Sequence, residues 1–211
     1  MNSEPNRPEF KRLWPTLFMS VPLPGAEAAN PVLKQFLLDE DNKHADLTGG
    51  YLAGNLMDTK HPAIGWLKQC FDRSVQDYAS EAGIRYDLTW SVQAWPNVNM
   101  KGDYHNLHNH PHSWLSGTYY VAVPENEGKQ HRSDLNPNAI SFFDPRGQAN
   151  MNAIHGDGQF DPEHRIQPQA GQLLLWPSFL HHLVHPNFAD EARVSVSFNV
   201  VLKWSDAYIG H

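Results

Sequence analysis

The chain has 211 residues, of which 40% are hydrophobic and 18% charged, and its formal net charge is −7 at pH 7. This length suits one domain with a sizeable core, and the composition is that of a folded globular protein. The acidic balance, without any run of Lys and Arg, argues against a nucleic-acid partner. The single cysteine, Cys70, excludes an internal disulfide framework and argues against a cysteine-based zinc site. Any metal would therefore be held by histidines and carboxylates.

The first 85 residues predict an extended arm followed by helices. "RLWPTLFMSVPLP" (12–24) alternates apolar residues between prolines and predicts an edge strand or extended arm. "NPVLKQFLLDED" (30–41) predicts a short helix with Asn30 as N-cap and Pro31 at its first position. "HPAIGWLKQCFDRSVQDYASEAG" (61–83) has apolar residues at steps of three and four, and Gly83 at its end. It predicts an amphipathic helix that covers a core and has no catalytic role.

Residues 86–211 change character to short β-type runs separated by turns. The predicted strand segments are "LTWSVQAW", "WLSGTYYVAV", "AISFF", "GQLLLWP", "LVHP" and "RVSVSFNVVLKW". Such spacing after helices predicts one mainly β structural domain with flanking helices, a sandwich or jelly-roll barrel backed on one side by the N-terminal helices. Residues 144–168 form a polar connection of a length typical of a lid or binding loop, with surface decoration as the alternative.

No segment of the chain predicts contact with a membrane. The first twenty residues lack an uninterrupted apolar stretch, and no later stretch is long enough to span a bilayer. A cytoplasmic location is therefore expected. Oligomeric state cannot be inferred from one sequence.

Histidines are concentrated in "HNLHNHPH" (105–112). Side chains two apart on an extended chain share a side, so His108 and His110 can point toward one ion, while His105 has the opposite parity. The other cluster, "PSFLHHLVHP", offers His181, His182 and His185. Adjacent strand residues face opposite ways, so only one of His181 and His182 can enter the same pocket. An H-x-H and a distant histidine in one barrel predict a metal site.

The last predicted strand has one polar and one apolar face. Arg193, Ser195, Ser197 and Asn199 alternate with Val194, Val196, Phe198 and Val200. The apolar face is expected to pack on helices or on the opposing sheet, and the polar face to line a cavity or meet solvent. If it faces inward, Arg193 requires an anionic partner, and its planar fork suits a carboxylate.

This order of motifs resembles the 2-oxoglutarate and Fe(II)-dependent oxygenase superfamily. More narrowly, "HNHPHSWLSGTYYVAVP", "FFDPR", "PQAGQLLLWPSFLHHLVHPN" and "RVSVSFNVV" resemble a 2OG-Fe(II) oxygenase family of bacteria and phages, over roughly residues 88–204. The resemblance implies a double-stranded β-helix (jelly-roll, cupin-like) fold. It also implies Fe(II) and 2-oxoglutarate, O₂, and a small-molecule or peptide substrate that is hydroxylated with release of succinate and CO₂.

Carried over by position, the resemblance makes His108 the first iron ligand and His182 the distal ligand. Arg193 would bind the distal carboxylate of 2-oxoglutarate, assisted by Ser195 and by either Tyr119 or Tyr120, since parity lets only one face inward. The superfamily has H-x-D/E at the first ligand pair, whereas this chain has His110 at the carboxylate position. The third ligand is therefore expected to be His110, with Asp103 as a possible substitute, and no catalytic residue is expected beyond the metal site.

Two alternatives compete with this interpretation. A cupin-type metal dioxygenase without 2-oxoglutarate fits Gly102 and the H-x-H after it, but the glutamate expected a few residues on is missing and Arg193 has no role. A non-catalytic jelly-roll binding protein would carry its histidines incidentally.

Overall fold

The computed structural model describes residues 15–41, 54–125, 135–146 and 161–203. Their elements are, in chain order, β1 (Met19–Pro22), α1 (Ala26–Asp41), the 3-10 turn η2 (Leu56–Asp58), α2 (Pro62–Glu81), β2 (Trp90–Asn99), β3 (His105–His108), β4 (Leu115–Ala122), β5 (Ile140–Phe143), β6 (Glu163–Ile166), β7 (Gln172–Pro177), β8 (His182–Val184) and β9 (Arg193–Leu202).

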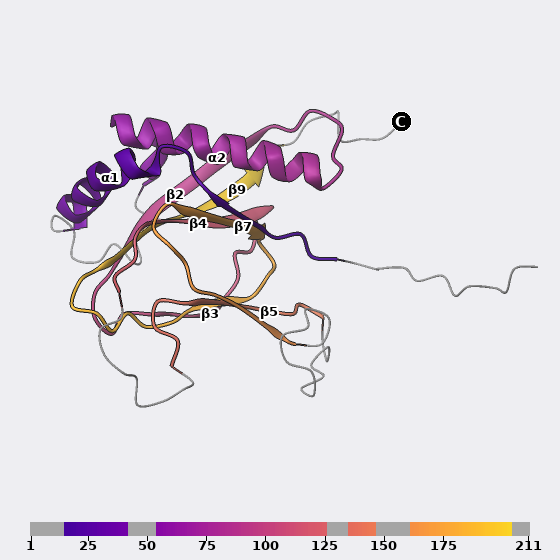
Figure 1. Cartoon of the computed structure of the whole chain (residues 1–211). Helices are drawn as coiled ribbons and strands as arrows, with labels where there is room; N and C mark the ends of the chain where they lie inside the picture. Colours follow the sequence, from indigo (N-terminus) through magenta and orange to yellow (C-terminus); the bar gives the residue numbers. More distant parts are fainter. Residues whose placement is uncertain (1–14, 42–53, 126–134, 147–160, 204–211) are drawn as a thin grey trace, which may run out of the picture.

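Two antiparallel sheets face one another beneath a layer of two helices (Figure 1). The larger sheet has the strand order β1-β7-β4-β9-β2, and the smaller one has the order β3-β8-β5-β6. Helices α1 and α2 cover the outer face of the larger sheet, whose other face looks toward the smaller sheet. The prediction of a mainly β fold backed on one side by helices is confirmed. Among the described strands no ladder joins the two sheets into a closed barrel.

Helix α2 forms where the sequence predicts it. The imidazole Nδ1 of His61 accepts the backbone N–H of Ala63 at 3.2 Å and caps the first turn. The predicted apolar stripe is buried, and its members are Ile64, Leu67, Phe71, Val75 and Tyr78. Gly83 has a φ of +80° just beyond the helix, a left-handed conformation that glycine adopts without strain.

Helix α1 begins at Ala26, five residues before Pro31, the first helical position that the sequence predicts. Pro31 therefore lies inside the helix, and Asn30 is not its N-cap; the Asn30 amide oxygen accepts the hydroxyl of Tyr119 instead. Proline at this position removes one backbone hydrogen bond. Two features offset this loss. The turn before Pro31 is rich in alanine, which has high helix propensity, and the leucines of the helix are buried in the core.

The predicted strands all form, with two differences in extent. β6 lies within residues 144–168, so that connection is not entirely a loop. It was missed because "EHRI" pairs only with β5 at the sheet edge and shows no apolar alternation. Residues 147–160 of the predicted lid lie outside the described residues. β3 ends at His108, so His110 lies beyond the strand that the parity argument assumed.

Strand β9 separates a hydrophobic core from a cavity. Its apolar residues belong to the core between the helices and the larger sheet, where the rings of Phe198 and Phe71 stack with centroids 3.9 Å apart. Its polar face lines a cavity between the two sheets. The predicted division of this strand into two faces is thus confirmed, and the polar face looks inward.

Substituting Gly117 with alanine is expected to destabilise the fold by about 2 to 3 kcal/mol. A Cβ here would lie 2.4 Å from the Phe198 ring and 2.7 Å from the carbonyl oxygen of Leu174, so either backbone or core must shift. Gly65→Ala on α2 is the matched control. Its Cβ meets no atom within 4 Å, and alanine should stabilise this helix by roughly 0.5 kcal/mol or more. Chemical denaturation measures both, and equal stability of the two variants would contradict the prediction.

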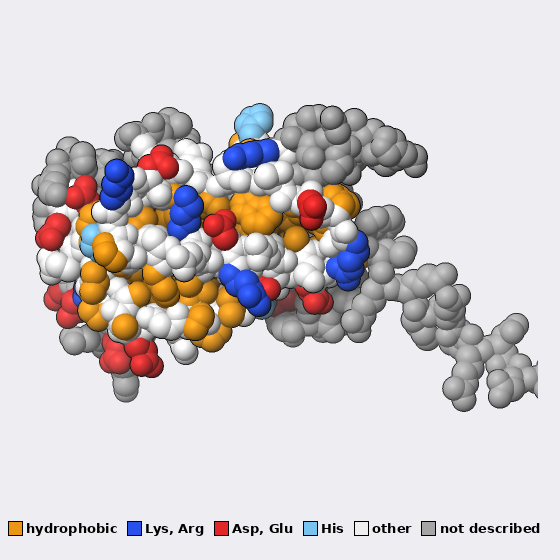
Figure 2. Space-filling view, turned by 90° about the horizontal axis from the view of Figure 1, so that it is seen from above, with side chains coloured by type: hydrophobic (Ala, Val, Ile, Leu, Met, Phe, Trp, Pro, Cys, Tyr) orange, Lys and Arg blue, Asp and Glu red, His pale blue; other side chains and the backbone are white. Residues whose placement is uncertain are grey.

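The outer face of the helical layer has a mixed character. In Figure 2 basic and acidic side chains are interspersed around a hydrophobic area over its described part. Neither α1 nor α2 combines the length and apolar character needed to cross a lipid bilayer.

Candidate active site

A cavity of about 600 Å³ lies between the two sheets. The larger sheet contributes mainly neutral polar side chains from β2, β4 and β9, and the smaller sheet contributes histidines and aliphatic residues from β3, β5 and β8. This volume is in the range of sites for small molecules. The cavity therefore brings together the two sequence regions that carry the candidate ligands.

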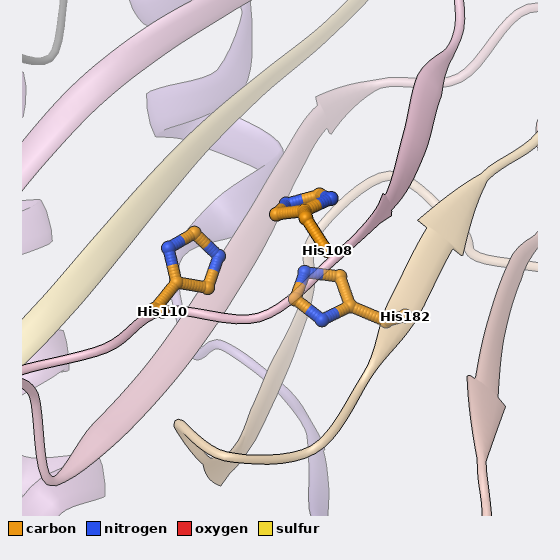
Figure 3. Close-up of side chains that lie close together, drawn as sticks. All are labelled: His108, His110 and His182. Carbon is orange, nitrogen blue, oxygen red and sulfur yellow. The ribbon is translucent and has the colours of Figure 1, made fainter.

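Three histidines meet in this cavity (Figure 3). His108 ends β3 and lies directly opposite His182, the first residue of β8, in the antiparallel pairing. His110 follows two residues after β3, and its backbone N–H donates to the carbonyl of Ser178 at 3.0 Å. One ring nitrogen from each histidine can be chosen so that all three lie within 4.8 Å of one another. That spacing allows three imidazoles to coordinate one metal ion.

Strand parity separates His182 from its neighbour as the sequence predicts. The His182 side chain is 3% exposed and lines the cavity, whereas that of His181 is exposed. Asp103, the possible substitute ligand, is exposed and does not line the cavity; its carboxylate accepts the backbone N–H of Met100. The cluster in the described part of the chain therefore consists of imidazoles alone.

Backbone carbonyls orient two of the three rings. The Nδ1 of His108 lies 2.6 Å from the carbonyl oxygen of Asn106, and the Nδ1 of His182 lies 3.0 Å from that of Leu180. Because a carbonyl can only accept, each Nδ1 carries the proton. The Nε2 lone pair of both rings is thereby left for a metal.

Burial keeps the histidine rings neutral. Desolvation, reinforced by the neighbouring His108, lowers the pKa of His110 to about 4 and that of His182 to about 3. The same causes, together with the positive charge of Arg193, lower the pKa of His105 to about 4. A neutral imidazole is the form that binds metal, so these rings need not lose a proton at neutral pH.

Arg193 is a buried charge that lines the same cavity. Its side chain is 0% exposed, and among the described residues it donates to neutral acceptors, namely the side chains of Asn99 and Asn138 and the carbonyl of His185. No carboxylate of the described residues forms an ion pair with it. Burial lowers the pKa of Arg193, but a guanidinium stays charged at neutral pH. A buried guanidinium that has no ion pair among the described residues is suited to bind an anionic ligand in the cavity.

The two candidate tyrosines face opposite ways on β4. Tyr120 lines the cavity, pairs in register with Ser195 of β9 and is 2% exposed. Burial raises the pKa of its hydroxyl, so it remains a neutral hydrogen-bond donor. Tyr119 points toward the helices, where its hydroxyl donates to Asn30. Ser195 lines the cavity beside Arg193, so Tyr120, Ser195 and Arg193 are brought together and Tyr119 is not.

Strand β2 supplies cavity residues that the sequence reasoning missed. Trp95, Asn97 and Asn99 share one face of β2 and line the cavity. Their signal was the alternation of "WPNVN" with period two, which predicts that Asn97 and Asn99 point to the same side. Asn97 Oδ1 and the indole N–H of Trp176, both in cavity-lining residues, are buried and have no hydrogen-bond partner within the described part of the chain. Such atoms are rare in folded proteins and mark places that a ligand can satisfy.

Residues 93–199, half of the chain, match the family described as "Putative 2OG-Fe(II) oxygenase". The chain belongs to the 2OG-Fe(II) oxygenases. It is therefore an enzyme whose cofactors are Fe(II) and 2-oxoglutarate, and the resemblance noted in its sequence is confirmed. The donor set fits these cofactors, since three neutral imidazoles suit a divalent transition metal and a buried guanidinium suits a dicarboxylate.

Solved structures show that this oxygenase shares its fold with other members of the superfamily. A prolyl-4-hydroxylase from Pseudomonas putida is 15% identical, with a TM-score of 0.57 over 89% of this chain and 88% of its own. A prolyl hydroxylase from Trichoplax adhaerens, in complex with a hypoxia inducible factor peptide fragment, is 16% identical, with a TM-score of 0.59 over 87% of this chain and 83% of its own. HygX from Streptomyces hygroscopicus, with nickel and 2-oxoglutarate bound, is 12% identical, with a TM-score of 0.51 over 92% of this chain and 85% of its own. No curated protein matches the oxygenase in sequence.

Proposed function

We propose that this oxygenase hydroxylates a small-molecule or peptide substrate, and that His108, His110 and His182 hold its iron. In the proposed reaction O₂ is reduced, one of its oxygen atoms enters a C–H bond of the substrate and the other enters succinate. Carbon dioxide leaves from 2-oxoglutarate in the same turnover. When bound, the iron supplies the oxygen chemistry, and the protein binds, orients and shields the reactants.

The observation that carries the proposal is the buried guanidinium of Arg193 in the same cavity as the three imidazoles. A guanidinium has five N–H donors, and three described hydrogen bonds use three of them, two on Nη1 and one on Nη2. One N–H remains on Nε and one on Nη2. These two can bind a carboxylate bidentately, which is the proposed role of Arg193 toward the distal carboxylate of 2-oxoglutarate.

Ser195 and Tyr120 complete the proposed co-substrate site. Both lie in register on neighbouring strands beside Arg193 and carry hydroxyl groups that can donate to the same carboxylate. Ile140 and Val184 line the cavity from the opposite sheet and supply apolar surface for the two methylene groups of the co-substrate. These contacts exclude water from the charged pair and so strengthen it.

The three-histidine ligand set changes the charge of the site. A site with two histidines and one carboxylate leaves iron with a net charge of +1, whereas three neutral imidazoles leave +2. The two carboxylates of 2-oxoglutarate would balance that charge. We therefore expect metal and co-substrate to stabilise one another more strongly than in a site that already contains a carboxylate.

Anaerobic titration tests the proposal without knowledge of the substrate. Fe(II) should bind to one site per chain, and 2-oxoglutarate added to the iron-loaded protein should produce a visible metal-to-ligand charge-transfer band. Admission of O₂ should then convert 2-oxoglutarate slowly to succinate. Protein with one tightly bound iron but no band at saturating 2-oxoglutarate would contradict the proposal and favour the cupin-type alternative.

A further inference from the structure

A chain of hydrogen bonds connects His105, a histidine of the 105–112 cluster outside the triad, to Arg193. The Nη2 of Arg193 donates to Asn99 Oδ1 at 3.1 Å, and Asn99 Nδ2 lies 3.2 Å from His105 Nε2. Asn99 and Arg193 are direct partners in the β2 and β9 pairing, while His105 begins β3 in the other sheet. The contact therefore crosses the cavity from one sheet to the other.

Each bond in this chain has one allowed direction. A guanidinium only donates, so Asn99 must present its amide oxygen to Arg193 and its NH₂ group to His105. His105 must then accept through Nε2, which requires a neutral ring with its proton on Nδ1. Burial lowers the pKa of His105 to about 4, so the ring is neutral at physiological pH.

The other side of the guanidinium is held independently. Nη1 donates to the carbonyl of His185 at 2.9 Å and to Asn138 Oδ1 at 3.4 Å. Asn138 is itself buried, and its backbone N–H donates to the carbonyl of Pro186. All three acceptors are neutral, so they orient the guanidinium without compensating its charge. The one described hydrogen bond of Nη2 goes to Asn99, which leaves the second N–H of this nitrogen for a ligand.

We propose that His105 is a positioning residue for the co-substrate: through Asn99 it orients Arg193 so that the free Nε and Nη2 donors meet the distal carboxylate of 2-oxoglutarate. This inference rests on the proposed function of Arg193. The His105 acceptor keeps the Asn99 NH₂ group on its own side and the Asn99 oxygen toward Arg193. Without that acceptor the Asn99 amide can rotate by 180° and turn its NH₂ group toward the guanidinium. Arg193 would then be held on one side only.

The test compares two 2-oxo acids in His105→Ala. Under anaerobic conditions with Fe(II) bound, the charge-transfer band is titrated with 2-oxoglutarate and with 2-oxobutyrate, which has no distal carboxylate. The variant should bind 2-oxoglutarate about tenfold more weakly, as expected for loss of one hydrogen bond to a buried polar group. Affinity for 2-oxobutyrate and the iron stoichiometry should not change. His105→Gln keeps an acceptor near Nε2 and should restore 2-oxoglutarate affinity to within about twofold of the native value.

The variants His181→Ala and Asn99→Asp serve as controls. His181→Ala removes an exposed histidine next to the triad and should alter neither affinity. Asn99→Asp gives Arg193 a permanent carboxylate and should weaken 2-oxoglutarate binding more than His105→Ala does, again without effect on 2-oxobutyrate. Unchanged 2-oxoglutarate affinity in His105→Ala, or equal losses for both acids, would overturn the inference while leaving the proposed function intact. Native protein that binds iron but no 2-oxoglutarate would overturn both.

Discussion

Replacing His182 with alanine is expected to weaken Fe(II) binding by more than about a hundredfold, because even groups that only orient a metal ligand cost ten- to a hundredfold. His182 is the most buried of the three imidazoles, and its Nδ1–H bond to Leu180 presents Nε2 to the cavity. Its removal leaves only two of the three protein ligands of the site, His108 and His110, which is too few to hold the ion stably. Equilibrium dialysis followed by metal analysis of untagged protein measures this loss.

The control for His182→Ala lies at the next position. His181→Ala removes an imidazole from the adjacent position, where the side chain is exposed, and should retain one iron per chain. A second informative variant is His110→Asp, which introduces the carboxylate usual in the superfamily and should also retain iron. Stoichiometric iron in His182→Ala would show that the metal lies elsewhere.

Replacing Arg193 with glutamine is expected to weaken 2-oxoglutarate binding by about thirtyfold or more. Loss of one partner from a buried, hydrogen-bonded charge pair costs roughly 2 to 5 kcal/mol, and each 1.4 kcal/mol is a factor of ten. Glutamine can still donate a hydrogen bond but carries no charge and cannot form the bidentate pair. Anaerobic titration of the charge-transfer band measures the affinity, and iron binding should persist because Arg193 is not in the metal cluster.

Arg193→Lys is the graded comparison for this prediction. Lysine keeps the charge but presents a single ammonium group, so it should recover only part of the lost affinity. For 2-oxobutyrate, which lacks the distal carboxylate, the glutamine variant should bind as native protein does. If Arg193→Gln binds 2-oxoglutarate as tightly as the native protein does, Arg193 does not bind the distal carboxylate and the proposed function is contradicted.

The backbone around His110, which occupies the position of the usual carboxylate, is held by contacts outside β3. The residue lies beyond the end of β3 and is positioned by the hydrogen bond from its backbone N–H to Ser178. Its ring contacts the His182 ring at a centroid distance of 5.2 Å and that of Trp95 at 5.9 Å. The His110 ring therefore lies beside the His182 ring although its backbone is outside the strand.

Local periodicity in the sequence was sufficient for several features of this protein. Alternation along β9 predicted which residues share its apolar face and that Arg193 and Ser195 share its polar face, because successive strand side chains point to opposite sides. The same rule separated His182 from His181. The apolar spacing in residues 61–83 predicted α2, since helical neighbours recur at three and four residues.

Other features depend on contacts between distant segments, which no local pattern contains. Pairing of β3 with β8 places His108 opposite His182, and the approach of Asn99, Asn138 and the His185 carbonyl determines the orientation of Arg193. Parity allowed either Tyr119 or Tyr120 to face inward, and the position of the helices relative to β4 selected Tyr120. The sequence by itself determined the two faces of each element, whereas the tertiary structure determined which faces meet, because hydrophobic burial and sheet pairing act across the whole chain.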